Sequence, residues 1–313
     1  MINYDKVSLT KMLNVVFIVM LIPFITLSLW LYNNNRNEIK NTINETMTQF
    51  VSNVSFMYIK PHVERINNEF MLLRNDKSTS VNLMDLNDDN NEFIKAAISS
   101  FNRTPHLSGV IISNNKKEFI ILPEINISEY DVEERPWFPH YGKDGEVVYS
   151  NAYTSSYSEY RGDNRMIITA AMNVFNSNKR KIGTVAYDLD MNYLSEKLKY
   201  ITLPFNSHLK VTDKKGMYII NDSINKNMTA RVPVEWVEAA DNKQGSFYDK
   251  KSRNHIFYYT YPNPEWVIFA VISEKDYNKE VGKMDAGFLV ALLSSSLYYL
   301  FLQYYVILFV ITF

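Results

Sequence analysis

Apolar residues form a long uncharged run near the start of the chain and another at its end. Residues 13–32 read LNVVFIVMLIPFITLSLWLY and contain no charged side chain. A helix needs about 20 such residues to cross the hydrocarbon core of a membrane, and the internal Pro23 is tolerated there. The run is longer than the apolar core of a signal peptide, and no small-residue cleavage motif follows it. We therefore expect a retained transmembrane helix over residues 12–32.

The second run, residues 288–313, reads FLVALLSSSLYYLFLQYYVILFVITF and is also uncharged. It predicts another transmembrane helix over residues 286–313, whose serines and Gln303 favour contact with a partner helix. Lys6 and Lys11 precede the first run, and we expect residues 1–11 to be cytoplasmic, although Arg36 and Lys40 follow the run closely and weaken the charge asymmetry. The remaining chain is then a domain tethered between two membrane helices.

Residues 33–75 carry apolar side chains at mostly three- and four-residue steps, which is typical of an amphipathic helix. The expected helix runs out of the membrane as a stalk and bends near Pro61. Its apolar stripe is wider than one small domain needs to cover. We expect it to pack against the domain and against a second copy of itself, which gives a homodimer.

Two blocks of strand-like runs follow the stalk. The first block, residues 76–200, has a polar loop and a short helix through Phe101. Five strand-like runs come next, and a helix closes the block at residues 191–201. The second block, residues 201–283, repeats the theme on a smaller scale, with a hairpin signal at residues 214–216. The pattern predicts an α+β protein with two stacked antiparallel sheets.

Composition removes several functions from consideration. The chain has 33 basic and 34 acidic residues, so no basic face for nucleic acid is indicated. Cysteine is absent, and the five histidines lack the spacing of metal ligands. No phosphate-binding glycine loop, nucleophile elbow or pair of catalytic carboxylates is recognisable. We expect no metal, no cofactor and no enzymatic activity.

The stretch YDVEERPWF, residues 130–138, is too polar for a core strand and too aromatic for an ordinary surface loop. With the later runs NAYTSS and KIGTVAYDLD, it resembles the amino-acid-binding subset of the double Cache family. This family comprises extracytoplasmic ligand-binding modules of bacterial chemoreceptors, sensor kinases and diguanylate cyclases. The resemblance covers residues 36–283. It implies six ligand-binding positions: Tyr130, Arg135, Trp137, Phe138, Tyr153 and Asp188.

The resemblance implies a long stalk helix that carries two PAS-like antiparallel-sheet modules between transmembrane helices. The ligand is expected in the membrane-distal module, residues 76–200, while the membrane-proximal module, residues 201–283, serves mainly as a spacer. Location in a bacterial inner membrane, with the sensor domain in the periplasm or outside the cell, is implied as well. One position departs from the family, because Phe138 stands where amino-acid binders usually have tyrosine.

Elementary chemistry agrees with this assignment. A free amino acid is a zwitterion, so its site must offer a cation at one end and an anion at the other. Arg135 can donate two parallel hydrogen bonds to a carboxylate, and Asp188 can accept from an ammonium group. Tyr130 and Tyr153 offer hydroxyls. Trp137 and Phe138 offer rigid apolar walls.

Other interpretations of the same residues remain open. The RPWF motif is also compatible with a structural corner, in which Arg135 pairs with Glu133 or Glu134 and Trp137 belongs to the core. Asp190 faces the same side as Asp188 if the strand continues. The polar run at residues 154–158 is expected at the rim. Packing is favoured over binding for three further side chains, Tyr141, Tyr149 and Met172.

Two functional hypotheses follow. In the first, the chain is a membrane-anchored sensor for a small amine-bearing ligand, an amino acid foremost, and it signals through its membrane helices. In the second, it is a Cache-like ectodomain that modulates a full-length receptor. No kinase, cyclase or methyl-accepting segment follows the second membrane run. For this reason, either a separate signalling protein supplies the output or an output domain has been lost.

Overall fold

The computed structural model describes residues 4–75, 83, 86, 91–124, 130–154, 166–221 and 230–312. These residues divide into two compact units. One unit contains both ends of the chain, residues 1–46 and 273–313, and the other contains residues 47–272. The two units are considered separately.

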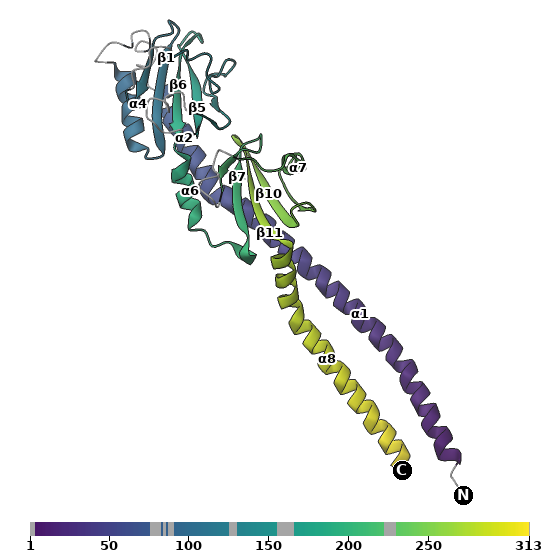
Figure 1. Cartoon of the computed structure of the whole chain (residues 1–313). Coiled ribbons are helices and arrows are strands. Elements are labelled where there is room, and N and C mark those ends of the chain that lie inside the picture. The colour runs from purple at the N-terminus through teal and green to yellow at the C-terminus, as the bar shows by residue number, and fades with distance from the viewer. Residues whose placement is uncertain are drawn as a thin grey trace. The chain divides into compact units, whose positions relative to one another are not determined.

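The first unit is built from two long helices, α1 (Tyr4–Val54) and α8 (Glu274–Thr312), which Figure 1 draws in purple and yellow. Within this unit, the rings of Phe24 and Tyr299 stack with their centroids 5.1 Å apart. Asn35 Nδ2 donates to Asp285 Oδ1 over 3.2 Å. Helices α1 and α8 therefore contact each other at these two points, one through apolar and one through polar side chains.

Within the described part of the chain, one segment is long and apolar enough to cross a membrane: Glu274–Val306, with a mean hydropathy of 1.5. It overlaps the second predicted span. The first predicted span falls within α1, which continues through Pro23 without a break. Many side chains between residues 12 and 21 lie outside the described part of the structure, so this span remains a prediction.

The second unit begins with the end of the stalk. Here α1 passes into a π-helical turn, Ser55–Ile59, and then into α2 (Lys60–Asn75). In an α-helix the N–H of residue 61 would bond to the carbonyl of Met57, and Pro61 has no N–H to donate. A wider helical turn therefore lies immediately before the proline, and the bend expected near Pro61 stays a prediction.

The larger sheet has six antiparallel strands in the order β2-β1-β6-β5-β3, with β4 paired to β5. Its long central strands are β1 (Leu107–Asn114), β5 (Met166–Phe175) and β6 (Lys181–Leu189). The edges are formed by β2 (Phe119–Leu122), β3 (Val147–Tyr149) and β4 (Tyr153–Thr154). The central strands are buried on both faces, which explains their nearly continuous apolar sequences.

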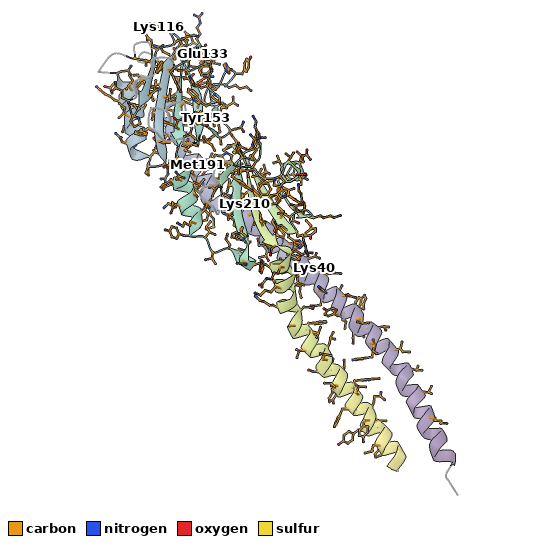
Figure 2. All side chains as sticks on the ribbon, viewed as in Figure 1. Lys40, Lys116, Glu133, Tyr153, Met191 and Lys210 are labelled. Carbon is orange, nitrogen blue, oxygen red and sulfur yellow. The ribbon has the colours of Figure 1, made fainter. Side chains whose placement is uncertain are left out.

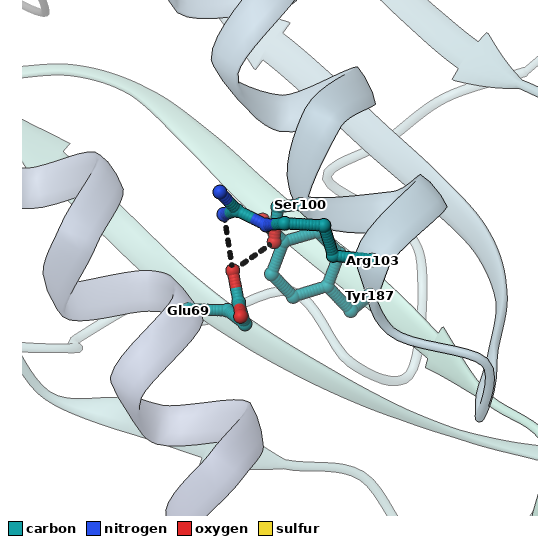
Figure 3. Close-up of polar contacts among 4 residues, drawn as sticks. All are labelled: Glu69, Ser100, Arg103 and Tyr187. Carbon is teal, nitrogen blue, oxygen red and sulfur yellow. Dashed lines mark hydrogen bonds and ion pairs between the residues drawn. The ribbon is translucent and has the colours of Figure 1, made fainter.

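Helices cover one face of this sheet. Both α2 and α4 (Glu92–Arg103) pack there, and the ring of Phe70 lies 4.6 Å from that of Tyr187 between centroids. The Tyr187 hydroxyl donates to Ser100, whose own hydroxyl donates to Glu69, and Glu69 also pairs with Arg103 (Figure 3). This network joins both helices to the central strand β6 and leaves the opposite face of the sheet for the segment 130–142.

The smaller sheet has five antiparallel strands in the order β8-β7-β11-β10-β9. These are β7 (His208–Thr212), β8 (Tyr218–Ile220), β9 (Gln244–Asp249), β10 (Asn254–Pro262) and β11 (Glu265–Ser273). Helix α6 (Met191–Lys199) and a 3-10 turn (Pro204–Asn206) connect the two sheets. One face packs on α7 (Val234–Ala239), where Trp236, Tyr258 and Phe269 form an aromatic core.

The three residues expected to pack divide into two groups. Met172 is fully buried, and Tyr149 donates its hydroxyl to Asn67 while its ring lies edge-on against Trp266. The expectation for Tyr141 is wrong, because 97% of this residue is exposed. Tyr141 lies in the turn after Pro139, where the backbone carbonyls of Pro139 and Gly142 are held by Asn173 and no core surface is required.

Asn173 provides a test of how this turn is held against the sheet. Its side chain is buried, donates to the carbonyls of Pro139 and Gly142 over 2.7 and 3.1 Å, and accepts from the Thr184 hydroxyl. Asn173→Ala removes these partners at once, so we expect a loss of about 1–3 kcal/mol in the free energy of unfolding. The measurement is urea unfolding of the full-length chain. Asn178→Ala, on an exposed turn, is the control and should leave the midpoint unchanged.

Candidate ligand-binding site

The segment 130–138 lies on the sheet face opposite the helices and is held by turns rather than by strand pairing. The N–H of Arg135 donates to the carbonyl of Val132, and that of Phe138 donates to the carbonyl of Arg135. Beneath the segment, Ala171 and Ala186 face each other on β5 and β6. Their small side chains leave room for Trp137, which is only 1% exposed.

Four of the six predicted residues form an aromatic cluster on this face. Tyr130 and Trp137 belong to its buried core, and Phe138 and Tyr153 pack against them. Tyr153, which is labelled in Figure 2, comes from β4, so the cluster joins two segments that are separate in the sequence. The predicted apolar wall is therefore present in the structure. The Nε1 atom of Trp137 is buried and makes no hydrogen bond to a described residue.

Arg135 stacks on this cluster, with its guanidinium carbon 4.3 Å from the centre of the Tyr130 ring. Its Nε donates to the backbone carbonyl of Asp131 over 3.0 Å. Glu133 pairs instead with Lys117 at 3.3 Å. The structural-corner interpretation is thus correct that Trp137 is a core residue. Arg135 contacts the Asp131 carbonyl and the Tyr130 ring, and its alternative pairing with Glu134 stays a prediction.

Asp188 lies on β6 two residues beyond Ala186, and therefore on the same face of the sheet. It is fully buried. The hydroxyl of Thr169, its partner on β5, donates to Asp188 Oδ1 over 2.5 Å and lies 2.6 Å from the Tyr153 hydroxyl. Asp188 Oδ2 has no hydrogen-bond partner among the described residues. Burial raises the pKa of Asp188 to about 8.

Asp190 points to a different role. It caps the N-terminus of α6 by accepting from the N–H of Asn192 over 2.9 Å. The strand ends at Leu189, so the alternation that would place Asp190 beside Asp188 is broken there. The alternative assignment of the anion to Asp190 is not supported by this geometry.

The polar groups of the cluster share one electrostatic environment. Burial raises the pKa of Tyr130, the Asp188 carboxylate raises it further, and Arg135 opposes the change. The pKa of Tyr153 is likewise raised by burial and by the Asp188 carboxylate, while its hydrogen bond to Thr169 opposes the increase. Both phenols are therefore neutral donors or acceptors at physiological pH. A cation and an anion act on them from within the same site.

A pocket of about 420 Å³ opens beside the cluster. Three of the predicted residues, Tyr130, Arg135 and Phe138, line it, together with Lys181, Thr184 and the turn after β1. Trp137, Tyr153 and Asp188 are not among its described lining residues. Of the predicted rim, residues 154–158, only Thr154 lies in the described part. The structure thus brings all six predicted residues to one sheet face, with three at an open pocket and three in the adjoining buried part.

Sequence reasoning missed two residues of this site. Thr169 bridges Tyr153 to Asp188, and a threonine at a buried position within the apolar run MIITAAM was the available signal. Lys181 places its ammonium 4.1 Å from the centre of the Phe138 ring, and burial lowers the pKa of this lysine. Nothing in the sequence around Lys181 indicates that contact. No group of three metal-binding side chains occurs among the described residues.

Comparisons with known proteins agree with this architecture. No protein-family model and no curated protein matches the sequence. Among solved structures, the chain is similar to the ligand-binding domain of the Campylobacter jejuni chemoreceptor Tlp3 in complex with L-norvaline. The TM-score is 0.60 at 12% identity, covering 77% of this chain and 95% of that one.

Two further structures are similar. The ligand-binding domain of Mlp24 with asparagine has a TM-score of 0.57 at 15% identity, covering 80% of this chain and 99% of that one. The corresponding domain of the Pseudomonas aeruginosa PAO1 amino-acid chemoreceptor PctC, in complex with GABA, has a TM-score of 0.53 at 16% identity, covering 74% and 99%. The chain therefore has the fold of the ligand-binding domains of amino-acid chemoreceptors, as its resemblance to the double Cache family predicts.

Proposed function

We propose that this chain is a membrane-anchored sensor that binds a free amino acid, or a closely related amine, in its larger sheet module. The observation that carries the proposal is the buried Asp188 carboxyl, which has one unpartnered oxygen on the same sheet face as Arg135. An isolated carboxyl in an apolar site is unfavourable unless a cation partner completes it. We assign the chain no catalytic activity.

The ligand's two charged ends have distinct partners in this proposal. Its ammonium group is held by Asp188, and its carboxylate by the guanidinium of Arg135, which Tyr130 orients by stacking. The tyrosine hydroxyls and the Trp137 indole add hydrogen bonds, and the aromatic rings exclude water. The named ligands of the similar domains, which are asparagine, L-norvaline and GABA, all carry an amine and a carboxylate, and this supports the assignment.

Signal transmission uses the two helices that leave the sensor. In the proposed protein, α1 and α8 cross a bacterial inner membrane, with the sheets in the periplasm or outside the cell. Ligand binding shifts these helices by about 1–2 Å, as is typical of helix-shift signalling. The stalk helix provides the contact between two copies in a homodimer. The smaller sheet, with its aromatic core, acts as a spacer.

The first prediction about the candidate site concerns the two residues proposed to hold the charged ends of the ligand. Arg135→Ala leaves a ligand carboxylate without its cation, so we expect affinity to fall by about 2–5 kcal/mol, or roughly thirtyfold to several-thousandfold. Asp188→Asn should weaken binding to a similar degree by removing the anion that faces the ammonium. The measurement is calorimetry of the full-length chain, titrated with the amino acids or amines that a thermal-shift screen identifies.

Arg180→Ala is the matched control, since Arg180 is an exposed arginine of the same module. It should bind like the unchanged protein. Unaltered affinity in both site variants, with the fold intact, would show that the cluster is structural. If no small molecule binds at all, the alternative role as an interaction partner of a full-length receptor becomes the better explanation.

The second prediction distinguishes an amino acid from a simple amine. Phe138→Tyr places a hydroxyl where the family has one, and this hydroxyl can donate to the ligand carboxylate. We expect a gain of about 0.5–1.5 kcal/mol for amino acids, or roughly two- to twelvefold in affinity. For an amine without a carboxylate the substitution should be neutral or harmful. Calorimetry with each ligand and its decarboxylated amine separates the two cases.

The third prediction concerns pH. In the ligand-free protein Asp188 is largely protonated below pH 8, and an arriving ammonium group favours its ionised form. Binding therefore releases a proton, and affinity should rise with pH by at most about tenfold per unit until it levels off near pH 8. Calorimetry at pH 6.5 in buffers of different ionisation enthalpy counts the released proton.

Asp188→Asn should abolish this proton release. It should also stabilise the ligand-free protein at pH 8. Because the folded-state pKa of Asp188 lies above its unfolded value, stability is lost as pH rises toward 8, and an amide does not ionise. Ligand binding without proton release in the unchanged protein would contradict the assignment of Asp188 as the ammonium partner.

A further inference from the structure

A second cluster of buried polar side chains lies where the stalk changes from π-helix to α2. His62, in the first turn of α2, and His106, just before β1, have their ring centroids 4.6 Å apart. They are 7% and 1% exposed. Tyr193 of α6 lies against both rings, at 5.4 Å from His106. The cluster therefore joins the stalk, the start of the larger sheet and the helix that leads to the smaller sheet (Figure 1).

Three of the four imidazole nitrogens of this pair lack partners among the described residues. His62 Nε2 and both ring nitrogens of His106 are buried without a hydrogen bond to any described residue. Leaving buried polar atoms unpaired is unfavourable, and native proteins do so where a ligand or function requires it. Neutral imidazole carries one N–H, so His106 has a donor without an acceptor whichever nitrogen carries its proton. His62 offers a second donor when its proton is on Nε2.

The carboxylates nearest to His106 are already engaged. Glu69 Oε2 accepts from the Ser100 hydroxyl at 2.7 Å and pairs with Arg103 at 3.1 Å, as Figure 3 shows. Asp190 Oδ1 accepts from the backbone N–H of Asn192. Both carboxylates raise the pKa of His106 electrostatically, but neither forms a hydrogen bond with it. The N–H of His106 therefore has no acceptor among the described residues, and a bound ligand could supply one.

A pocket of about 150 Å³ opens onto these two rings. Its charged lining is entirely basic: Arg65 on α2 and Lys197 on α6, both exposed at the rim. The Lys197 ammonium lies 5.5 Å from the centre of the Tyr193 ring, which forms one wall together with Tyr58. Among the described lining residues there is no carboxylate.

We propose that this pocket is a binding site for a small oxyanion, such as a carboxylate, sulfate or phosphate. The anion accepts hydrogen bonds from His62 and His106 at the buried end, and Arg65 and Lys197 neutralise its charge at the rim. The volume admits a ligand of only a few heavy atoms. This site is separate from the cluster around Arg135 and Asp188, and neither proposal depends on the other.

A metal ion fits the same residues less well. Two histidines are fewer than the three or four protein ligands of ordinary zinc sites, and no third metal-binding side chain completes a group among the described residues. The basic groups at the rim, Arg65 and Lys197, repel a cation as well. The charge of the pocket thus selects an anion over a metal.

Binding at this site should depend on pH. In the ligand-free protein, burial lowers the pKa of His62 to about 3 and that of His106 to about 4, with Arg65 lowering both further. Glu69 and Asp190 oppose the change at His106. Both rings are therefore neutral at pH 7. A bound anion favours the imidazolium form, so affinity rises as pH falls, by at most about tenfold per unit for each proton taken up.

The test is calorimetry of the full-length chain in detergent, titrated with sodium sulfate and, separately, sodium acetate. Sulfate keeps its charge between pH 5.5 and 7.5, so a change in its affinity reports on the protein alone. We expect binding at one site, at least roughly threefold tighter at the lower pH. His106→Gln and Arg65→Met should each weaken it at least fivefold. Arg65 is exposed, so its replacement does not threaten the fold.

Arg74→Met is the matched control, because it removes the same charge from an exposed position on the same helix. It should bind sulfate like the unchanged protein. The proposal is overturned if neither sulfate nor acetate binds, or if Arg65→Met and His106→Gln bind as tightly as the control. Saturable Zn²⁺ binding that is lost in His106→Gln, without anion binding, would overturn it in favour of a metal site.

Discussion

The larger sheet is buried on both faces, and most of what is distinctive about the chain follows from that constraint. Helices α2 and α4 cover one face and form their own regular backbone hydrogen bonds. The other face is covered by an irregular segment, residues 130–142, which has few regular backbone bonds of its own. Its polar groups must be satisfied by side chains such as Asn173. This segment therefore places polar groups against the apolar strands, and the candidate site lies on that face of the sheet.

Much of this arrangement could be predicted from the sequence. The central strand β6 follows the expected run KIGTVAYDLD to within one residue, because a strand buried on both faces needs such a run. The aromatic and charged positions of the motif could be recognised because they lie within nine residues. Their resemblance to a known pattern then pointed to Tyr153 and Asp188.

The remaining features depend on contacts that no local pattern contains. Lys181 meets Phe138 across more than forty positions of sequence, and His62 meets His106 across a similar distance. Asp190 was ambiguous because the alternation of a strand does not reveal where the strand ends. Tyr141 was misplaced for a related reason. An aromatic residue in a turn is buried only if the turn faces a core, whereas this turn is bonded to Asn173 through its backbone carbonyls and leaves Tyr141 exposed.

The hydroxyl of Thr169 has a consequence for the direction of the bonds around it. When Asp188 is ionised, as in the proposed ligand complex, this hydroxyl donates its single proton to Asp188, so the tyrosine is the donor in the 2.6 Å contact with Tyr153. The phenolic proton is thereby committed, and only oxygen lone pairs of Tyr153 remain for a ligand. Tyr153 and Asp188, which as residue types suggest a donor and an acceptor, thus both offer hydrogen-bond acceptors to a ligand. This end of the site is therefore suited to recognising N–H groups.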